Sequence, residues 1–267
     1  MSTSPNTGQR PTAQPFHKKS LFVAALAAAT LLAACGGNNS TPPLFGNTRI
    51  VNGMTDSTGL SASVNNVPTF SSVNFGGASG IRTEPDGDYK VQVSSASNAN
   101  TRGNITFTVD NVKISHDTMA TVLTYGVLNN STQNGFTARQ SLDNPASGNF
   151  GIQPLHAAYA ASLANPTLSF YLVRPGAGIV GASPLSTPFA QSTPLVALAN
   201  GTYEIIVTNG TTTVFDSGPK GLTLPPATTN VLQLAALDAP GAPNGSNISL
   251  LLLDNGGGTK ALLNGAN

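Results

Sequence analysis

Short stretches of alternating apolar and polar residues dominate this chain from residue 48 onward. In residues 89–93 and 105–110 every second residue is apolar, and the pairs Asn65-Asn66 and Asp86-Gly87 are turn formers. A period of two is the pattern of a strand with one buried face. Further strands are expected at 48–51, 60–64, 67–75, 119–128 and 136–142. Beyond residue 35 no run of 11 or more residues has helical periodicity, so the pattern predicts an all-β fold of antiparallel, Ig-like sandwiches.

The second half of the chain repeats features of the first half. Residues 86–93 (DGDYKVQV) correspond to residues 200–207 (NGTYEIIV), and Val51-Asn52 corresponds to Leu155-His156. A repeat of about 100 residues is the size of one small domain. We therefore expect two tandem β-sandwich domains, at 47–147 and 148–258, followed by a C-terminal tail or closing strand at 259–267.

The start of the chain has the order of an export signal: basic, then apolar, then small. Lys18 and Lys19 precede an uncharged apolar run at 21–34, which is too short to cross a bilayer as a helix. The ending Leu32-Ala33-Ala34-Cys35 resembles the lipobox of bacterial lipoproteins. That resemblance implies a signal peptide at 1–34, cleaved by a peptidase that recognises residues 32–34, and a lipidated Cys35. The alternative is a secreted protein that is cleaved near Ala34 without lipidation.

Lipidation implies lasting attachment to a membrane. One acyl chain holds a protein only marginally, whereas two or three chains, such as palmitate, on Cys35 would hold it stably. Residues 35–46 are then the lipidated cysteine and a flexible tether. Gly36 stands where inner-membrane lipoproteins usually have Asp, which implies the outer membrane of a Gram-negative-type envelope, facing either the periplasm or the cell surface.

Composition limits the partners that the chain can have. Charged residues make up only 9% of the sequence, and three of the 12 basic residues lie in the predicted signal peptide. The remaining nine basic and 11 acidic residues give a net charge of about −2, which argues against nucleic acid as a partner. Because the only cysteine is Cys35, a disulfide within the chain is excluded, and each domain must be stabilised by its core.

The chain contains three short motifs: an opening Arg49-Ile50-Val51-Asn52, a central Gly-X-Tyr that ends at Tyr89 and at Tyr203, and a closing Leu-Asp-Asn at 142–144 and 253–255. In this combination the sequence resembles that of tandem DUF4397-domain lipoproteins. The second copy departs from the opening motif, with Gln153-Pro154-Leu155-His156 in its place. The resemblance implies β-sandwich modules with an envelope role, and it supplies no activity, cofactor or catalytic residue.

The densest acidic group, Glu84, Asp86 and Asp88, is a weak candidate for a calcium site, because calcium prefers several oxygen ligands. The second copy has the uncharged Asn200 and Thr202 at two of these positions, whereas the glycine and the tyrosine of the Gly-X-Tyr motif are the same in both copies. We therefore interpret the acidic group as a solvated turn that leads into a strand, and we expect no metal or cofactor.

His116 and His156 are the candidates for catalysis. In a strand, His116 and Asp117 would point to opposite faces and could not pair, and the chain has no Gly-X-Ser-X-Gly elbow. We predict a non-catalytic, lipid-anchored module with a binding, adhesion or structural role towards an envelope protein or polysaccharide. The alternative is a periplasmic hydrolase that uses one of these histidines. Tyr89 and Tyr203 are expected to lie in the cores, with each hydroxyl on a backbone partner.

Overall fold

A computed structural model describes residues 42–97, 105–226, 229–239 and 248–265 of the chain. The predicted signal peptide, with Leu32, Ala33 and Ala34, and the predicted lipidation site Cys35 lie outside these residues. Among the described residues, no helix has both the length and the apolar character needed to cross a membrane.

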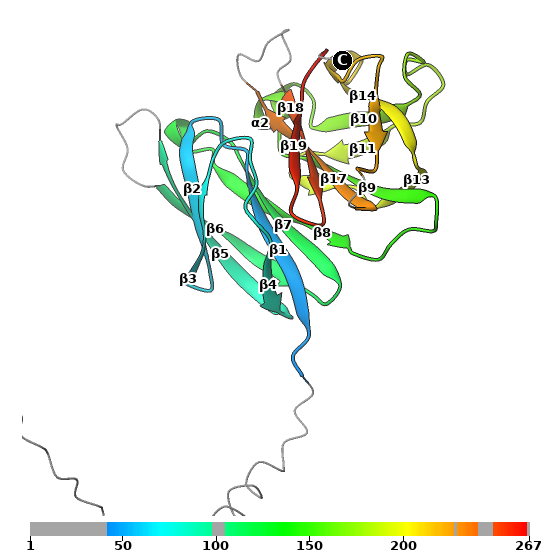
Figure 1. The fold of residues 1–267 in the computed structure, drawn as a ribbon. Coiled ribbons are helices and arrows are strands. Elements are labelled where there is room, and N and C mark those ends of the chain that lie inside the picture. Colours follow the sequence, from blue (N-terminus) through cyan, green and yellow to red (C-terminus); the bar gives the residue numbers. More distant parts are fainter. Residues whose placement is uncertain (1–41, 98–104, 227–228, 240–247, 266–267) are drawn as a thin grey trace, which may run out of the picture. The chain divides into compact units, whose positions relative to one another are not determined.

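The first half of the described chain, here called lobe 1, consists of two four-stranded sheets (Figure 1). Inner sheet 1 has the order β4-β1-β7-β8, and outer sheet 1 has the order β3-β2-β5-β6. The elements are β1 (Phe45–Asn52), β2 (Ser57–Val64), β3 (Val67–Val73), β4 (Arg82–Pro85), β5 (Gly87–Ser97), β6 (Ile105–Ile114), β7 (Thr118–Tyr125), the 3-10 helix η1 (Leu128–Asn130) and β8 (Asn134–Ser141).

The second half, lobe 2, has the same kind of architecture. Inner sheet 2 has the order β12-β9-β17-β18-β19, with β13 also paired to β9, and outer sheet 2 has the order β11-β10-β14-β15, with β16 paired to β14. The elements are β9 (Asn149–His156), α2 (Tyr159–Ala164), β10 (Thr167–Val173), β11 (Leu185–Pro188), β12 (Gln191–Ser192), β13 (Val196–Ala199), β14 (Gly201–Asn209), β15 (Thr212–Asp216), β16 (Leu222–Leu224), β17 (Val231–Asp238), β18 (Ile248–Asp254) and β19 (Thr259–Leu262).

The all-β fold predicted from the alternation is confirmed, and most expected strands are present within a few residues. Asn65 and Asn66 both have positive φ, 46° and 67°, which is the backbone of a hairpin turn that asparagine tolerates. The strand β4 was not expected, because four residues containing a proline give no readable alternation. The small apolar run at 157–164 contains the short helix α2, and the run at 231–236 lies in β17.

Each inner sheet contains one parallel strand pair among otherwise antiparallel ones. β1 pairs with β7 in parallel, so that Val51 lies opposite Leu123, and β9 pairs with β17 in the same way, so that Leu155 lies opposite Ala235. The two lobes thus share this unusual pairing of their opening strands. The closing motifs are less alike, because Leu253 lies within β18 whereas Leu142 follows the end of β8.

The two core tyrosines occupy matching positions in the two lobes. The hydroxyl of Tyr89 donates to the carbonyl of Pro85 at 2.7 Å, and that of Tyr203 donates to the carbonyl of Ala199 at 2.7 Å. Each ring is partly buried against the core of its own lobe. The predicted placement of both rings, with the hydroxyl on a backbone partner, is confirmed.

A third apolar core joins the two inner sheets. Val51 and Leu123 of lobe 1 are in one cluster with Leu155, Leu237 and Leu253 of lobe 2, and all five side chains are at most 3% exposed. The inner strands are therefore buried on both faces, and every residue of β17 is buried. A strand with two buried faces is read in the sequence as a continuous apolar run instead of an alternation. The predicted boundaries of two separate domains stay a prediction.

The shared core predicts that lobes 1 and 2 unfold in one cooperative transition. Calorimetry should give equal calorimetric and van't Hoff enthalpies. Leu123→Ala, which removes a fully buried side chain from this core, should cost roughly 2–5 kcal/mol of unfolding free energy and shift the whole transition. Two resolved transitions, with only one of them shifted by Leu123→Ala, would contradict the coupling.

Candidate functional site

A buried polar network crosses the apolar core between the lobes, and its centre is Arg49 in β1. The Arg49 side chain is 0% exposed. Its Nε donates to Thr121 Oγ1 at 3.1 Å, its Nη1 to the carbonyl oxygen of Asp254 at 2.6 Å, and its Nη2 to Gln233 Oε1 at 2.8 Å. Thr121 belongs to the same lobe as Arg49, whereas Asp254 and Gln233 belong to lobe 2. The guanidinium therefore ties both lobes together.

The network continues through two glutamines of lobe 2. Thr121 Oγ1 donates to Gln233 Oε1 at 2.6 Å, and Gln233 Nε2 donates to Gln153 Oε1 at 2.9 Å. Gln153 Nε2 then donates to the carbonyls of Arg139 and Thr193, at 2.9 and 3.0 Å. Both amide groups are thus oriented by partners on each side, which fixes the position of one sheet against the other.

The electrostatics of Arg49 fit a structural role. Burial lowers the pKa of Arg49 to about 10, while the charge of Asp254 opposes that change. The side chain therefore keeps its charge at neutral pH, and its three hydrogen-bond acceptors are uncharged oxygens. A buried cation is costly unless its donors find acceptors, and each of the three guanidinium nitrogens has one oxygen acceptor.

The imidazole of His156 accepts a hydrogen bond from a backbone amide in lobe 2. Its side chain is 0% exposed, and its Nδ1 accepts a hydrogen bond from the amide of Ala158 at 3.3 Å, so the proton of the neutral ring lies on Nε2. In lobe 1, Asn52 Oδ1 accepts the amide of Met54 at 3.1 Å in the same manner, two residues further on. The predicted correspondence between Asn52 and His156 is visible in this shared geometry.

The surroundings of His156 hold it neutral. Burial lowers its pKa to about 4, and Nε2 has no hydrogen-bond partner among the described residues. The ring of Phe189 lies edge-on to the imidazole, with 5.4 Å between the ring centroids. An imidazole enclosed in this way is out of reach of solvent and substrate.

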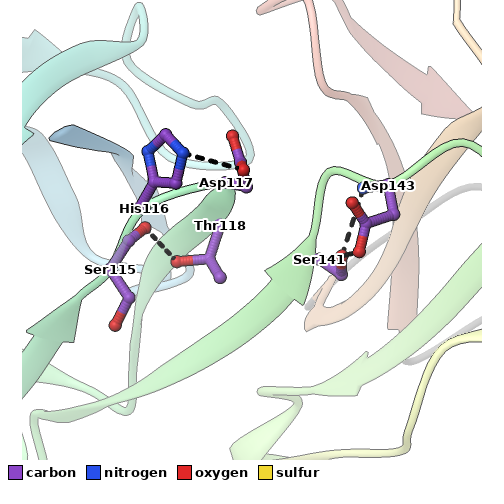
Figure 2. A network of polar contacts seen from close by, with 6 residues as sticks. All are labelled: Ser115, His116, Asp117, Thr118, Ser141 and Asp143. Carbon is purple, nitrogen blue, oxygen red and sulfur yellow. Dashed lines mark hydrogen bonds and ion pairs between the residues drawn. The ribbon is translucent and has the colours of Figure 1, made fainter. Parts of the chain in front are cut away.

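His116 and Asp117 form an exposed ion pair, which corrects the expectation that they could not pair. The Nε2 of His116 lies 2.9 Å from Oδ2 of Asp117, and the two side chains are 50% and 68% exposed (Figure 2). They lie in the turn between β6 and β7, where Asp117 has a φ of 54°, and not in a strand with alternating faces. The turn brings adjacent side chains to the same side.

The other polar groups near His116 do not complete a nucleophile site. The Ser115 hydroxyl accepts from Arg139 Nη2 at 3.1 Å, and the Ser115 carbonyl accepts from the Thr118 hydroxyl at 2.7 Å. Ser141 donates to Asp143 at 2.7 Å in a separate contact just after β8 (Figure 2). Within the described ranges, no serine or threonine hydroxyl is hydrogen-bonded to His116.

Glu84, Asp86 and Asp88 lie along the β4–β5 connection, where Asp86 separates the two strands. The described parts of the chain contain no group of three or more His, Cys, Asp or Glu side chains that could hold a metal ion. This geometry offers no support for the weak calcium candidate.

Two concave surfaces remain as candidate binding sites. A cavity of about 280 Å³ is lined by residues of both lobes, among them Thr55, Val127, Ala160 and Asp238. The Asp238 carboxylate accepts the amide of Ala160 at 2.9 and 3.0 Å, and burial raises the pKa of Asp238 although these amide contacts oppose the change. The carboxylate thus serves mainly to hold the first turn of α2.

The second concave surface is an open groove of about 250 Å³ on the outer face of outer sheet 1. Its hydrogen-bonding side chains are neutral, and they come from β2, β5 and β6: Ser61, Ser63, Gln92, Ser94 and Thr106. Ser61 pairs with Ser94, and Ser94 with Thr106, so the hydroxyls lie in a row across three strands. This groove can offer hydrogen bonds without charge.

Sequence reasoning missed the polar network because its contacts join residues up to 205 positions apart. One signal was present: Arg49 stands in an apolar strand, directly before Ile50 and Val51. A charged residue in such a place is either exposed at an edge or paired inside the protein.

Loss of Arg49 should destabilise the protein strongly. Arg49→Ala removes the donor to the Asp254 carbonyl and one of the two donors to Gln233 Oε1, and it leaves a cavity in the core, which together should cost about 3–5 kcal/mol in urea unfolding. Lys90→Ala is the matched control, because the Lys90–Asp110 ion pair is exposed, and it should cost less than about 1 kcal/mol. Equal losses for the two variants would contradict a central role of Arg49.

His156 should make stability depend on pH between about 6.5 and 4. Its pKa is lowered in the folded state, so the unfolded chain binds its proton first as the pH falls. The folded state should lose about 3 kcal/mol of stability from this group over that range, and the loss should be absent above pH 6.5. His156→Asn, which copies Asn52 of lobe 1, should flatten the dependence in urea titrations. A slope that survives in His156→Asn would refute this assignment.

Comparison with known proteins bears on the first part of the chain. Residues 46–164, from β1 to the end of α2, match the family described as "Domain of unknown function (DUF4397)". A search of curated proteins finds no match. The matched residues include Arg49 in β1 and the Gly-X-Tyr motif at the start of β5. The match supports a DUF4397 domain in residues 46–164.

Proposed function

We propose that this chain is a lipid-anchored protein of the bacterial outer membrane, whose two β-sandwich lobes act as one non-catalytic binding or structural module. The observation that carries the proposal is the only cysteine of the sequence, Cys35, which follows Leu32-Ala33-Ala34 at the end of an apolar run. The first described residue, Pro42, follows seven positions later, so any tether is short.

Two features support a second DUF4397-like domain in lobe 2. The parallel pairing of its opening strand and the hydroxyl contact of Tyr203 repeat the geometry found in lobe 1. The fusion of both inner sheets through one core would make the pair a single rigid body. A rigid body on a short tether is suited to presenting surfaces in the envelope.

The contacts of the two candidate histidines support the non-catalytic alternative. His156 caps a backbone amide inside the protein, and His116 pairs with Asp117 on the surface. The neutral groove on outer sheet 1 offers hydroxyl and amide groups to a partner, and these groups suit an uncharged envelope polymer or a polar protein surface. This arrangement favours binding over hydrolysis.

The anchor can be tested by moving the cysteine. Wild-type protein should be found in the outer-membrane fraction with a mass that corresponds to cleavage before Cys35 plus acyl groups. Cys35→Ala should lack the acyl mass and leave that fraction. The double variant Cys35→Ala, Ser40→Cys keeps one thiol but loses the Leu-Ala-Ala-Cys order, so it should behave like Cys35→Ala. Wild-type protein recovered soluble, with a free thiol, would sink the proposal.

A further inference from the structure

Three large apolar side chains are exposed in lobe 1. Leu44 is 52%, Phe45 is 46% and Val67 is 64% exposed. Leu44 and Phe45 continue an exposed stretch that starts with Pro42 and Pro43, in the last part of the predicted tether at 35–46. We call the surface formed by Leu44, Phe45 and Val67 the tether end of lobe 1.

Backbone contacts place these residues at one end of lobe 1. The carbonyl of Leu44 accepts the amide of Asp86 at 2.8 Å, and Phe45 pairs with Pro85. The β2–β3 turn before Val67 is held to β5, because the amide of Asn65 donates to the Lys90 carbonyl at 2.9 Å. The chain reaches β1 beside β4, and the β2–β3 turn lies at the same end of the other sheet (Figure 1).

The other exposed large apolar side chains lie apart in lobe 2. They are Leu163 on α2, Val180 in the connection after β10 and Leu263 after β19. Single exposed apolar residues are normal on a protein surface. Leu44 and Phe45 differ from the residues of lobe 2 because they are consecutive and directly precede the body of β1, on the side of the predicted attachment point.

The length of the predicted tether identifies that partner. Leu44 lies nine positions after Cys35, and nine extended residues reach at most about 32 Å. Acyl chains on Cys35 would therefore hold the tether end within that distance of the bilayer surface at all times. At so high an effective concentration even a small apolar contact is populated.

Charge does not oppose such a contact. The acidic residues near this end, Glu84, Asp86 and Asp88, are accompanied by Arg82, Lys90 and Lys113, and the ladder places Asp88 opposite Lys113. A surface of mixed sign is neither strongly attracted to anionic lipid nor strongly repelled by it. Apolar side chains must then supply the contact.

We propose that Leu44, Phe45 and Val67 rest in the headgroup region of the bilayer that holds the acyl chains of Cys35. This inference depends on the proposed lipid anchor and adds an orientation to it. The proposed contact involves lobe 1 alone.

The chain has no tryptophan, so one introduced tryptophan reports on one position. Full-length, lipidated Phe45→Trp, Val67→Trp and Val180→Trp are reconstituted into phosphatidylethanolamine–phosphatidylglycerol vesicles that contain brominated acyl chains. Emission from Phe45→Trp and Val67→Trp should shift to the blue and be quenched about twofold, because headgroup-level residues reach the acyl boundary. Val180→Trp, from a 98% exposed position in lobe 2, should show neither change.

Two controls separate the possible failures. Each variant should carry acyl mass, float with the vesicles and keep the urea midpoint of the parent. If the acyl mass is missing, the proposed anchor fails. If acylated protein floats but Phe45→Trp and Val67→Trp emit as in water, or if Val180→Trp is quenched equally, the anchor stands and the proposed orientation is overturned.

Discussion

The buried guanidinium of Arg49 is the contact on which the arrangement of the two lobes depends. A charge in the middle of an apolar interface is costly unless each donor finds an oxygen at the right place. Thr121 on its own sheet and two acceptors on the opposite sheet supply those oxygens. A slip of one sheet over the other would separate these atoms, so the network selects one register where apolar packing alone would tolerate several.

The departure of the second copy from the opening motif follows from this contact. Arg49 lies opposite Thr121 in one parallel ladder, and Gln153 lies opposite Gln233 in the matching ladder. A second arginine at position 153 would bring two buried positive charges into the same interface. A glutamine can instead accept with its oxygen and donate with its amide, and Gln153 does both. The two lobes thereby make complementary contributions to the interface.

The sequence predicts those features that depend only on neighbouring residues within one strand or turn. Alternation located most strands, and the asparagine pair at 65 and 66 located a hairpin turn, because both are local properties. The pairing of His116 with Asp117 was predicted wrongly because an assumed strand is a turn. The interlobe core and the Arg49 network could not be predicted, because they depend on which distant strands meet. The position of Cys35 was readable from residue order alone, and its lipidation stays a prediction.

The position of β1 in the chain determines how the protein responds to a force on its N-terminal segment. It is the first element after the N-terminal segment, it carries Arg49, and it lies between β4 and β7 in its sheet. Its ladder with β7 is parallel and joins six residue pairs. A pull on the N-terminal segment along the strand loads the bonds of this ladder together, in shear, instead of opening them one at a time. The first strand after the predicted anchor is thus paired in a geometry that resists tension.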